Sequence, residues 1–339
     1  MEDRDGVDSG GGPVKMRAAA LLLFFFVPGA RVLDITPAVA TERVANDPDD
    51  PAVWRHPSDA SQSLILGTNK AAAPDGALHV FGLDGKTRQV IGGLDRPNNV
   101  DVEGNLAVVT ERNKQQLRVF RADPATGRWA DAGAIPVFEG QRGEAALAMG
   151  IGLYRRPKDG ALFATVSRKT GPSGTYLWQY RLEDDGTRVT GRKVREFGQY
   201  AGGANNEIEA VAVDDTEGYV YYSDETCCVR KYHADPDRAG GATAEVGRHA
   251  TDKYQGQREG IAVTPFWLIV TDQIAGKSEY HVYAKRGEAV RPLFILRGMA
   301  DSTDGIEFAA ALPGFPDGLL IAMNSAGKNF QLYPLKSRY

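Results

Sequence analysis

Hydrophobic and polar residues alternate in short segments along most of the chain, and these segments follow one repeated order. Each copy begins with a short apolar alternation, often led by an acidic residue, and a turn follows. Next come a strand rich in β-branched and aromatic residues, a polar triplet, and a further strand that ends in an aromatic residue. The order recurs in residues 49–81, 98–120, 149–182, 208–232, 258–283 and 303–333. The closing aromatic residues are Phe81, Phe120, Tyr180, Tyr232, Tyr283 and Tyr333.

A period of about 50 residues with several strands in each unit is typical of the blades of a β-propeller. Helical repeats are the alternative, but no segment sustains a 3.6-residue hydrophobic period, and Val, Ile, Tyr and Gly dominate. The 39 glycines and 18 prolines agree with many turns between short strands. We therefore predict an all-β fold, a six-bladed β-propeller, as one domain over residues 44–339. Closure of the ring would protect the strand edges.

Residues 1–40 are predicted to form an N-terminal arm and a signal peptide. Residues 16–30 combine a basic start with an apolar run that is too short to span a bilayer as a helix. The A-x-A pattern of residues 38–40 predicts a cleavage that leaves Thr41 as the mature N-terminus. We therefore expect a secreted or periplasmic protein with no membrane contact after cleavage, in surroundings where calcium is plentiful.

The overall charge is small, because 44 acidic and 40 basic residues leave a formal net charge of −4. This balance does not favour a nucleic-acid partner, so any basic function must be local. The five histidines show no metal-ligand spacing, which argues against zinc. The two cysteines, Cys227 and Cys228, are adjacent, and neighbouring residues rarely form a relaxed disulfide.

Acidic residues recur at one position of the repeat, the start of the predicted innermost strand. In a propeller the starts of the inner strands converge on one mouth of the central channel. Carboxylates gathered there would raise one another's pKa values unless a cation lay among them, and oxygen-only clusters favour Ca²⁺. The alternative is that each acid caps a turn or pairs with an arginine. The set comprises Asp50, Asp101, Glu209, Glu259 and Asp304.

Polar triplets follow the next strand of each unit, at 68–70, 110–112, 167–169, 223–225, 271–273 and 323–325. Because successive antiparallel strands connect on alternating faces, the triplets should share a rim with the acids. They supply Lys70, Arg112 and Lys169 from three consecutive units and Glu225 from the fourth. Arginine binds phosphate as a bidentate fork and lysine as a point charge. The rim thus predicts a phosphate-rich ligand held by calcium and by these cations, although each cation taken alone is also explained as a solvated surface charge.

The motifs as a set resemble the β-propeller phytases, which are calcium-dependent enzymes that dephosphorylate inositol hexakisphosphate. The resemblance extends from about residue 46 to residue 335, in order and with compatible spacing. It implies a 3-phytase-type phosphatase that acts on phytate, a small-molecule substrate presented as a calcium complex, and we expect a monomer. The motifs that carry it are DPDDPAVW, GTNK, NNVDV, TER, IEAVAVDD, REGIAV, TDGIE and KNFQLYPL.

The resemblance also implies roles for single residues. The family's phosphate-binding basic residues match Lys70, Arg112 and Lys169. Its calcium-ligand or active-site carboxylates match Asp49, Asp50, Asp101, Glu209, Glu225, Glu259 and Asp304. Among these acids, Glu209, Glu225 and Glu259 are expected to act in catalysis with the basic residues. The implied reaction is metal-assisted hydrolysis without a covalent intermediate.

This chain departs from the family pattern at three places. Gln257 stands where the family has an acid, Met149 stands where it has a tyrosine, and an aspartate before TDG is absent unless Asp301 substitutes for it. These changes predict a weaker calcium site and a lost hydroxyl. The alternatives are another calcium-dependent propeller hydrolase, lactonase-like or phosphotriesterase-like, and a non-catalytic propeller that binds a partner.

Overall fold

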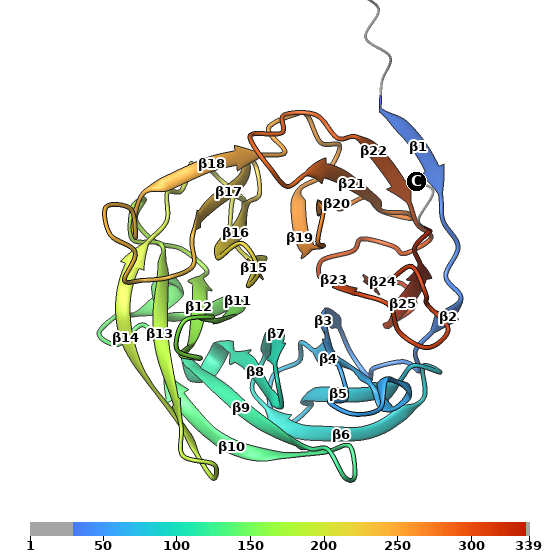
Figure 1. Ribbon diagram of the computed structural model, residues 1–339, viewed down its shortest axis with the longest axis horizontal. Coiled ribbons are helices and arrows are strands. Elements are labelled where there is room, and N and C mark those ends of the chain that lie inside the picture. Colours follow the sequence, from blue (N-terminus) through green and yellow to red (C-terminus); the bar gives the residue numbers. More distant parts are fainter. Residues whose placement is uncertain (1–29, 337–339) are drawn as a thin grey trace, which may run out of the picture.

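The strands of residues 30–336, which are the part of the chain that the computed structural model describes, form six sheets around a central axis (Figure 1). The predicted all-β fold and six-bladed propeller are confirmed, and no α-helix occurs among these residues. Of the predicted N-terminal arm and signal peptide over residues 1–40, residues 1–29 lie outside the described part. Within residues 30–336, no helix has the length and hydrophobicity that crossing a membrane requires.

Within each blade, successive strands run antiparallel from the channel to the outer wall. Blade one contains β3 (Pro48–Trp54), β4 (Leu64–Asn69), β5 (Gly76–Gly82) and β6 (Thr87–Leu94). Blade two contains β7 (Pro97–Glu103), β8 (Leu106–Glu111), β9 (Gln116–Asp123) and β10 (Arg128–Pro136). Blade three contains β11 (Ala148–Arg155), β12 (Leu162–Arg168), β13 (Leu177–Asp184) and β14 (Val189–Phe197). Blades four and five contain β15 (Val211–Asp214), β16 (Tyr219–Asp224), β17 (Cys228–His233) and β18 (Glu245–His249); and β19 (Arg258–Val263), β20 (Trp267–Asp272), β21 (Glu279–Ala284) and β22 (Phe294–Arg297). Blade six contains β23 (Ile306–Ala309), β24 (Leu319–Asn324) and β25 (Asn329–Pro334). In the described part of the chain, three short 3₁₀ helices lie in connections: η1 (Ala60–Gln62), η2 (Arg112–Lys114) and η3 (Gly143–Ala146).

The hydrophobic core consists of six clusters, and each cluster lies between two neighbouring blades. Between blades one and two, for example, the rings of Trp54 and Trp129 meet edge to face at 5.8 Å. The aromatic residues that close the six sequence repeats all lie on the third strands and are at most 1% exposed. The sequence repeat therefore marks the blade correctly, because each third strand buries its aromatic side chain against a neighbouring sheet.

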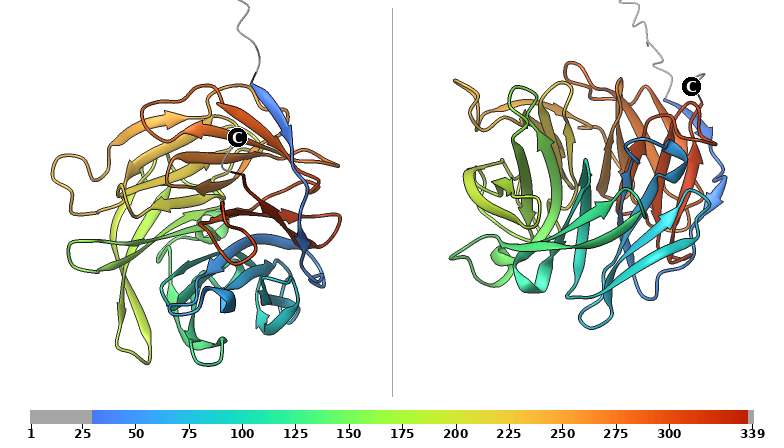
Figure 2. Two further views of the ribbon diagram at one scale, coloured as in Figure 1. Left: turned by 45° about the vertical axis from the view of Figure 1, so that its right-hand side comes forward. Right: turned by 60° about the horizontal axis from the view of Figure 1, so that its bottom comes forward.

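The ring is closed by the N-terminal segment, which supplies strands to the last two blades (Figures 1 and 2). β2 (Val39–Ala40) pairs antiparallel with β25 as the fourth strand of blade six, and β1 (Arg31–Asp34) pairs parallel with β22 of blade five. Between them, Ile35 is 6% exposed and belongs to the core cluster of blades five and six. The predicted domain start at residue 44 thus leaves both strands outside, and a cut after Ala40 would detach them.

Four inner strands carry a β-bulge just after they begin. The register shifts between Pro48 and Pro51 in β3, and at the equivalent places in β7, β11 and β19. A bulge bends its strand and re-aims the side chains next to it. At the bulge of β11 the neighbouring chain segment comes very close. A Cβ added to Gly150 would lie only 1.7 Å from the carbonyl oxygen of Glu209. The bulges therefore shape the rim at one mouth of the channel.

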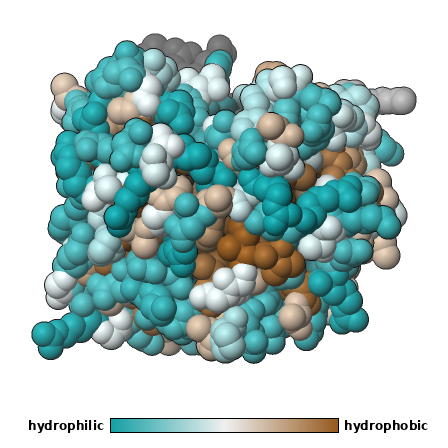
Figure 3. Space-filling view, turned by 90° about the horizontal axis from the view of Figure 1, so that it is seen from below, coloured by the Kyte–Doolittle hydropathy of each residue, from teal (hydrophilic) through white to brown (hydrophobic). Residues whose placement is uncertain are grey.

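The side of the outer wall formed by β6 and β10 is largely polar (Figure 3). Figure 3 views the side on which β6 and β10 lie, and hydrophilic residues cover most of it around one group of hydrophobic residues. In β6 the burial alternates between half-buried and exposed residues over most of its length, as expected for an outermost strand with one face in solvent. The charged residues of the predicted site lie elsewhere, around the channel.

Candidate active site

In three of the rim triplets the first residue binds one blade to the next through its hydroxyl group. Thr68 Oγ1 donates to the carbonyl oxygen of Asn98 at 2.6 Å, and Thr110 Oγ1 donates to that of Met149 at 2.6 Å. Ser223 Oγ repeats the contact from blade four to blade five at 2.5 Å. These hydroxyls are fully buried, so the contacts fix the spacing of neighbouring inner strands at the rim.

The second residue of a triplet holds the loop that leads into the inner strand of its own blade. Asn69 Oδ1 accepts from the amides of Asn46 and Asp47, both at 3.0 Å. Asp272 accepts from the amides of Gln255 and Gly256 at 2.9 and 2.7 Å. The loops that carry the acidic residues are therefore fixed by buried polar side chains, which leaves the third position of each triplet free for chemistry.

The third position in blade one is Lys70, and three carboxylates surround its ammonium group. Lys70 Nζ forms an ion pair with Asp49 and lies 3.6 Å from Asp304 Oδ2 and 3.9 Å from Glu209 Oε1. Burial by itself would lower the pKa of Lys70, but these carboxylates outweigh it and raise the pKa, so Lys70 is charged. Residues from blades one, four and six thus meet at one ammonium group.

The third position in blade two is Arg112, which a buried asparagine connects to Glu209. Arg112 donates to Asn98 Oδ1, and Asn98 Nδ2 donates to Glu209 Oε1. The guanidinium also lies 3.6 Å from Glu209 Oε1. Burial works to raise the pKa of Glu209, but Lys70 and Arg112 overcome it and hold that pKa below its ordinary value. Glu209 is therefore ionised at neutral pH.

The third positions in blades three and four are Lys169 and Glu225. Lys169 Nζ forms an ion pair with Glu207, a residue that the sequence analysis did not select. Glu225 Oε2 accepts from Gln257 Nε2 at 3.0 Å. Carboxylate oxygens of Glu207, Glu209 and Glu225 lie within 4.8 Å of one another. Burial, followed by repulsion from Glu209 and Glu207, raises the pKa of Glu225.

A small pocket at the rim is lined by Asp49, Glu209, Glu259 and Asp304. Asp49 is 1% exposed, and its Oδ2 has no hydrogen-bond partner in the described chain. Glu259 is 8% exposed, and among residues 30–336 its carboxylate forms no hydrogen bond or ion pair. Burial is the main cause that raises the pKa values of Asp49, Glu259 and Asp304. A buried carboxylate without a partner is costly, so the pocket favours a cation.

Comparison with known proteins identifies the family. The chain matches the family described as Phytase over residues 16–329. The chain belongs to the phytase family. A curated relative, the 3-phytase of Bacillus subtilis (strain 168), is 27% identical over 324 residues, which cover 86% of this chain and 78% of that protein. The solved structure of regucalcin, a calcium-binding protein from Agrobacterium tumefaciens, superposes with a TM-score of 0.57 at 12% identity and covers 91% of this chain and 97% of that chain. At that identity the likeness concerns the fold alone.

The family match confirms the resemblance that the motifs indicate, and it confirms the predicted enzyme class, a phosphatase of the phytase type. It also decides against the lactonase-like alternative. The structure brings part of the predicted set of site residues together at the rim. Lys70, Arg112, Lys169 and Glu225 occupy third positions of their triplets, while Asp49, Glu209, Glu259 and Asp304 line the pocket beside them.

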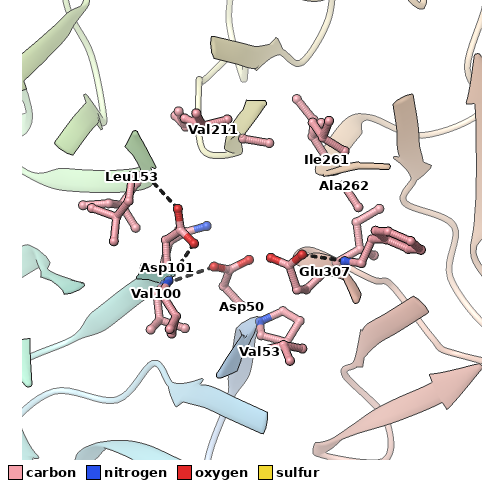
Figure 4. Close-up of a pocket in the computed structure, with 18 of the residues that line it drawn as sticks. Asp50, Val53, Val100, Asp101, Leu153, Val211, Ile261, Ala262 and Glu307 are labelled. Carbon is pink, nitrogen blue, oxygen red and sulfur yellow. Dashed lines mark hydrogen bonds between the residues drawn. The ribbon is translucent and has the colours of Figure 1, made fainter. Parts of the chain in front are cut away.

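Two predicted calcium ligands of this phytase, Asp50 and Asp101, lie deeper than the rim pocket. They line a cavity of about 260 Å³ in the channel together with Glu307, and Figure 4 shows the carboxylates of Asp50 and Glu307 facing each other while that of Asp101 is turned toward Leu153. Asp50 accepts from the amide of Val100 at 3.0 Å, and Asp101 accepts from that of Leu153 at 2.7 Å. Burial raises the pKa of Asp50 well above its ordinary value, that of Asp101 to about 7 and that of Glu307 to about 8.

The three departures from the family pattern have structural outcomes. Gln257 still contacts the rim, but it donates to Glu225 instead of adding a carboxylate. Met149 is fully buried in the bulge of β11, so no hydroxyl stands there. Asp301 accepts from the amide of Gly276 and from Ser302 Oγ and is not among the residues lining the pocket, so it does not substitute for the missing aspartate.

Sequence reasoning missed three residues of this phytase: Asn98, Glu207 and Glu307. Asn98 lies in the NNVDV motif, and Glu207 stands two positions before Glu209, where a second acid on the same rim loop was a visible signal. Glu307 follows Asp304 by three residues and reaches the deeper cavity from inside β23. The two glutamates were hidden because the repeat selected at most one acid for each blade, and Asn98 was hidden because the search was for charged residues.

Proposed function

We propose that this phytase releases phosphate from phytate with the help of Ca²⁺ held by the rim carboxylates. The observation that carries the proposal is the meeting of Lys70, Arg112 and Lys169 with carboxylates of several blades, where the buried Asp49 Oδ2 has no hydrogen-bond partner in the described chain. The 3-phytase from Bacillus subtilis, which is similar over most of the chain, supports phytate as the substrate.

The residues at the rim fit calcium. All of the pocket's charged donors are carboxylates, and Ca²⁺ prefers six to eight oxygen ligands. Asp49, Glu209, Glu259 and Asp304 would hold the ion, with Glu225 beside them. The acids outnumber the three cations, and their pKa values are raised first by burial and then by mutual repulsion, both of which a divalent ion would offset. Calcium bound there would neutralise phosphate charge and lower the pKa of a water that attacks phosphorus.

The basic residues would bind and orient the substrate. Arg112 presents a planar guanidinium that suits two phosphate oxygens, and the lysines act as point charges. Charge that develops on the phosphoryl oxygens in the transition state would be stabilised by these fixed cations. Because they come from three consecutive blades, they form an arc that can contact more than one phosphate of a polyphosphorylated ring. Phytate carries such neighbouring phosphates.

We infer a second calcium position in the deeper cavity. Asp50, Asp101 and Glu307 all line that cavity, and burial raises all three pKa values. Two of the three were predicted as metal ligands from the sequence. Calcium at this position would bind blades one, two and six together and so support the rim above it.

Phosphate release from phytate, measured with calcium and after chelation, tests the proposal. Activity that requires calcium and is lost in Glu209→Gln is expected, with no turnover of a lactone offered in parallel. A protein that binds calcium yet releases no phosphate would favour the non-catalytic alternative. Phosphate release at full rate in excess chelator would overturn the role of the metal.

We also propose that the protein is exported, because extracellular calcium is abundant enough to fill sites of moderate affinity. We propose separately that it works as a monomer. Fractionation of cells that express the full chain tests the first part, since activity confined to the cytoplasm would contradict export. Light scattering of the purified protein tests the second.

A further inference from the structure

We propose that Glu207 is a further calcium ligand at the rim, and that it exchanges its ion pair with Lys169 for the metal when the site fills. This inference rests on the calcium binding proposed above. It concerns a residue that the sequence motifs did not select, and it assigns Lys169 two alternating partners.

The position of Glu207 supports the first part. Its carboxylate lies within 4.8 Å of those of Glu209 and Glu225, close enough for one ion to contact all three. A backbone hydrogen bond of 3.3 Å from the amide of Glu225 to the carbonyl oxygen of Glu207 joins the two loops that carry them. The cluster therefore does not depend on long side chains that meet by chance.

The neighbouring pocket gives an independent indication of a cation. Glu209 belongs both to the cluster and to the pocket, where Asp49 Oδ2 is buried without a partner. Glu259, which is 8% exposed, also lacks a partner there in the described chain. Acidic residues that served only the fold would have these oxygens satisfied by hydrogen bonds.

Gln257 explains why a carboxylate at position 207 matters. Its side chain reaches Glu225 Oε2 from blade five, but it adds no negative charge. Its second amide hydrogen bond goes to the carbonyl oxygen of Asn205 at 2.8 Å, on the same loop as Glu207. Gln257 thus orients this part of the rim, and Glu207 supplies the charge beside Glu225 that Gln257 does not.

The exchange of partners follows from the surroundings of Lys169. Its side chain is 29% exposed and Glu207 is its ion-pair partner. The backbone of Lys169 is held by Tyr176 Oη, which donates to its carbonyl oxygen at 2.9 Å, so the flexible side chain can turn while its Cα stays in place. A metal that takes Glu207 would release Lys169 for a substrate phosphate.

Calcium titration calorimetry without substrate tests the inference. The comparison uses the full chain and three variants, Glu207→Gln, Lys169→Met and, as a matched control, Glu183→Gln, whose side chain is 60% exposed on β13. Glu207→Gln should weaken calcium binding about tenfold or more. Lys169→Met should strengthen it about two- to fivefold, because the metal no longer competes with an ion pair. The control should match the unmodified chain.

The outcomes separate this inference from the proposed function. If the unmodified chain binds no calcium, the proposed function fails and the role of Glu207 fails with it. If the unmodified chain binds calcium and Glu207→Gln binds it equally well, only the role of Glu207 is refuted, and Glu207 then serves to hold Lys169. Equal melting temperatures of chain and variants in chelator would exclude misfolding as the cause of any loss.

Discussion

Removal of the two N-terminal strands should destabilise the propeller although it leaves every site residue in place. The perturbation compares a chain that starts at Arg31 with one that starts at Thr41. The shorter chain lacks β1 and β2, so the outer edges of blades five and six become exposed. It corresponds to the product of the cleavage that the A-x-A pattern predicts after Ala40.

The structure sets the expected size of the effect. Ile35 is 6% exposed, and burying such a side chain contributes about 2 kcal/mol. The amides of Ile35 and Ala38 donate to Arg297 and Leu332 at 2.9 and 2.8 Å, and each bond contributes about 1 kcal/mol net. The loss is therefore about 4 kcal/mol, a large part of the stability of an ordinary domain. For a chain of this size it corresponds to a melting temperature roughly 6 °C lower.

Thermal unfolding followed by circular dichroism, with calcium held at one saturating concentration, measures the difference. Ile35→Ala in the longer chain should account for about half of it, whereas Val32→Ala, at a position 39% exposed on β1, should change little. Melting temperatures of the two chains within about 2 °C of each other would refute the reasoning. If a leader is removed in the cell, N-terminal sequencing of the mature protein should place the cut before Arg31.

Three further predictions concern the charged residues. Calcium should raise the melting temperature, by the equivalent of about 2.7 kcal/mol at 100 times its dissociation constant, and chelation should reverse the shift; an unchanged melting curve would contradict metal binding to the native state. Lys169→Ala and Glu209→Gln should each abolish phosphate release from phytate while circular dichroism stays unchanged, and near-full activity with saturating calcium would be inconsistent with their roles. Burial raises the pKa of Glu307 to about 8. The folded state therefore holds the proton of Glu307 more tightly than the unfolded state does, so Glu307 should destabilise the metal-free fold as the pH rises from about 4.5 to 8. In chelator, Glu307→Gln should therefore be more stable than the unmodified chain at pH 8.5, by a few kcal/mol at most, and equally stable at pH 4; urea unfolding at both values measures this, and a less stable variant at pH 8.5 would refute it.

The fold was predictable because one pattern recurs six times. Each third strand carries an aromatic residue that is buried between blades, so the spacing of Phe81, Phe120 and their equivalents reports the blade directly. The strands β1 and β2 escaped the same logic. They are short, they lie far in sequence from the partners β22 and β25, and their apolar residues also suit a leader.

The site was predictable at the third position of each triplet and less so elsewhere. Adjacent residues of a strand point to opposite sides, so Asp49 and Asp50 cannot both face the rim pocket, and the bulge of β3 decides which one does. A bulge is a property of pairing with β4 and leaves no clear mark in a single sequence. The roles of Thr68 and Asn69 were also hidden, because their partners belong to loops that only the closed ring brings near.

Because cations and carboxylates pair at the rim, the binding of calcium and the binding of substrate affect each other. Lys70, Arg112 and Lys169 are each held by carboxylates, and most of these are proposed metal ligands. Phosphate that bound alone would take the cations and leave buried acids unpaired, while calcium that bound alone would take the acids and leave the cations without partners. Each ligand thus removes the penalty that the other creates, so the two should bind with positive coupling, and by linkage the coupling is equal in both directions. A substrate that already carries calcium on its phosphates would satisfy both halves of the rim in one binding event.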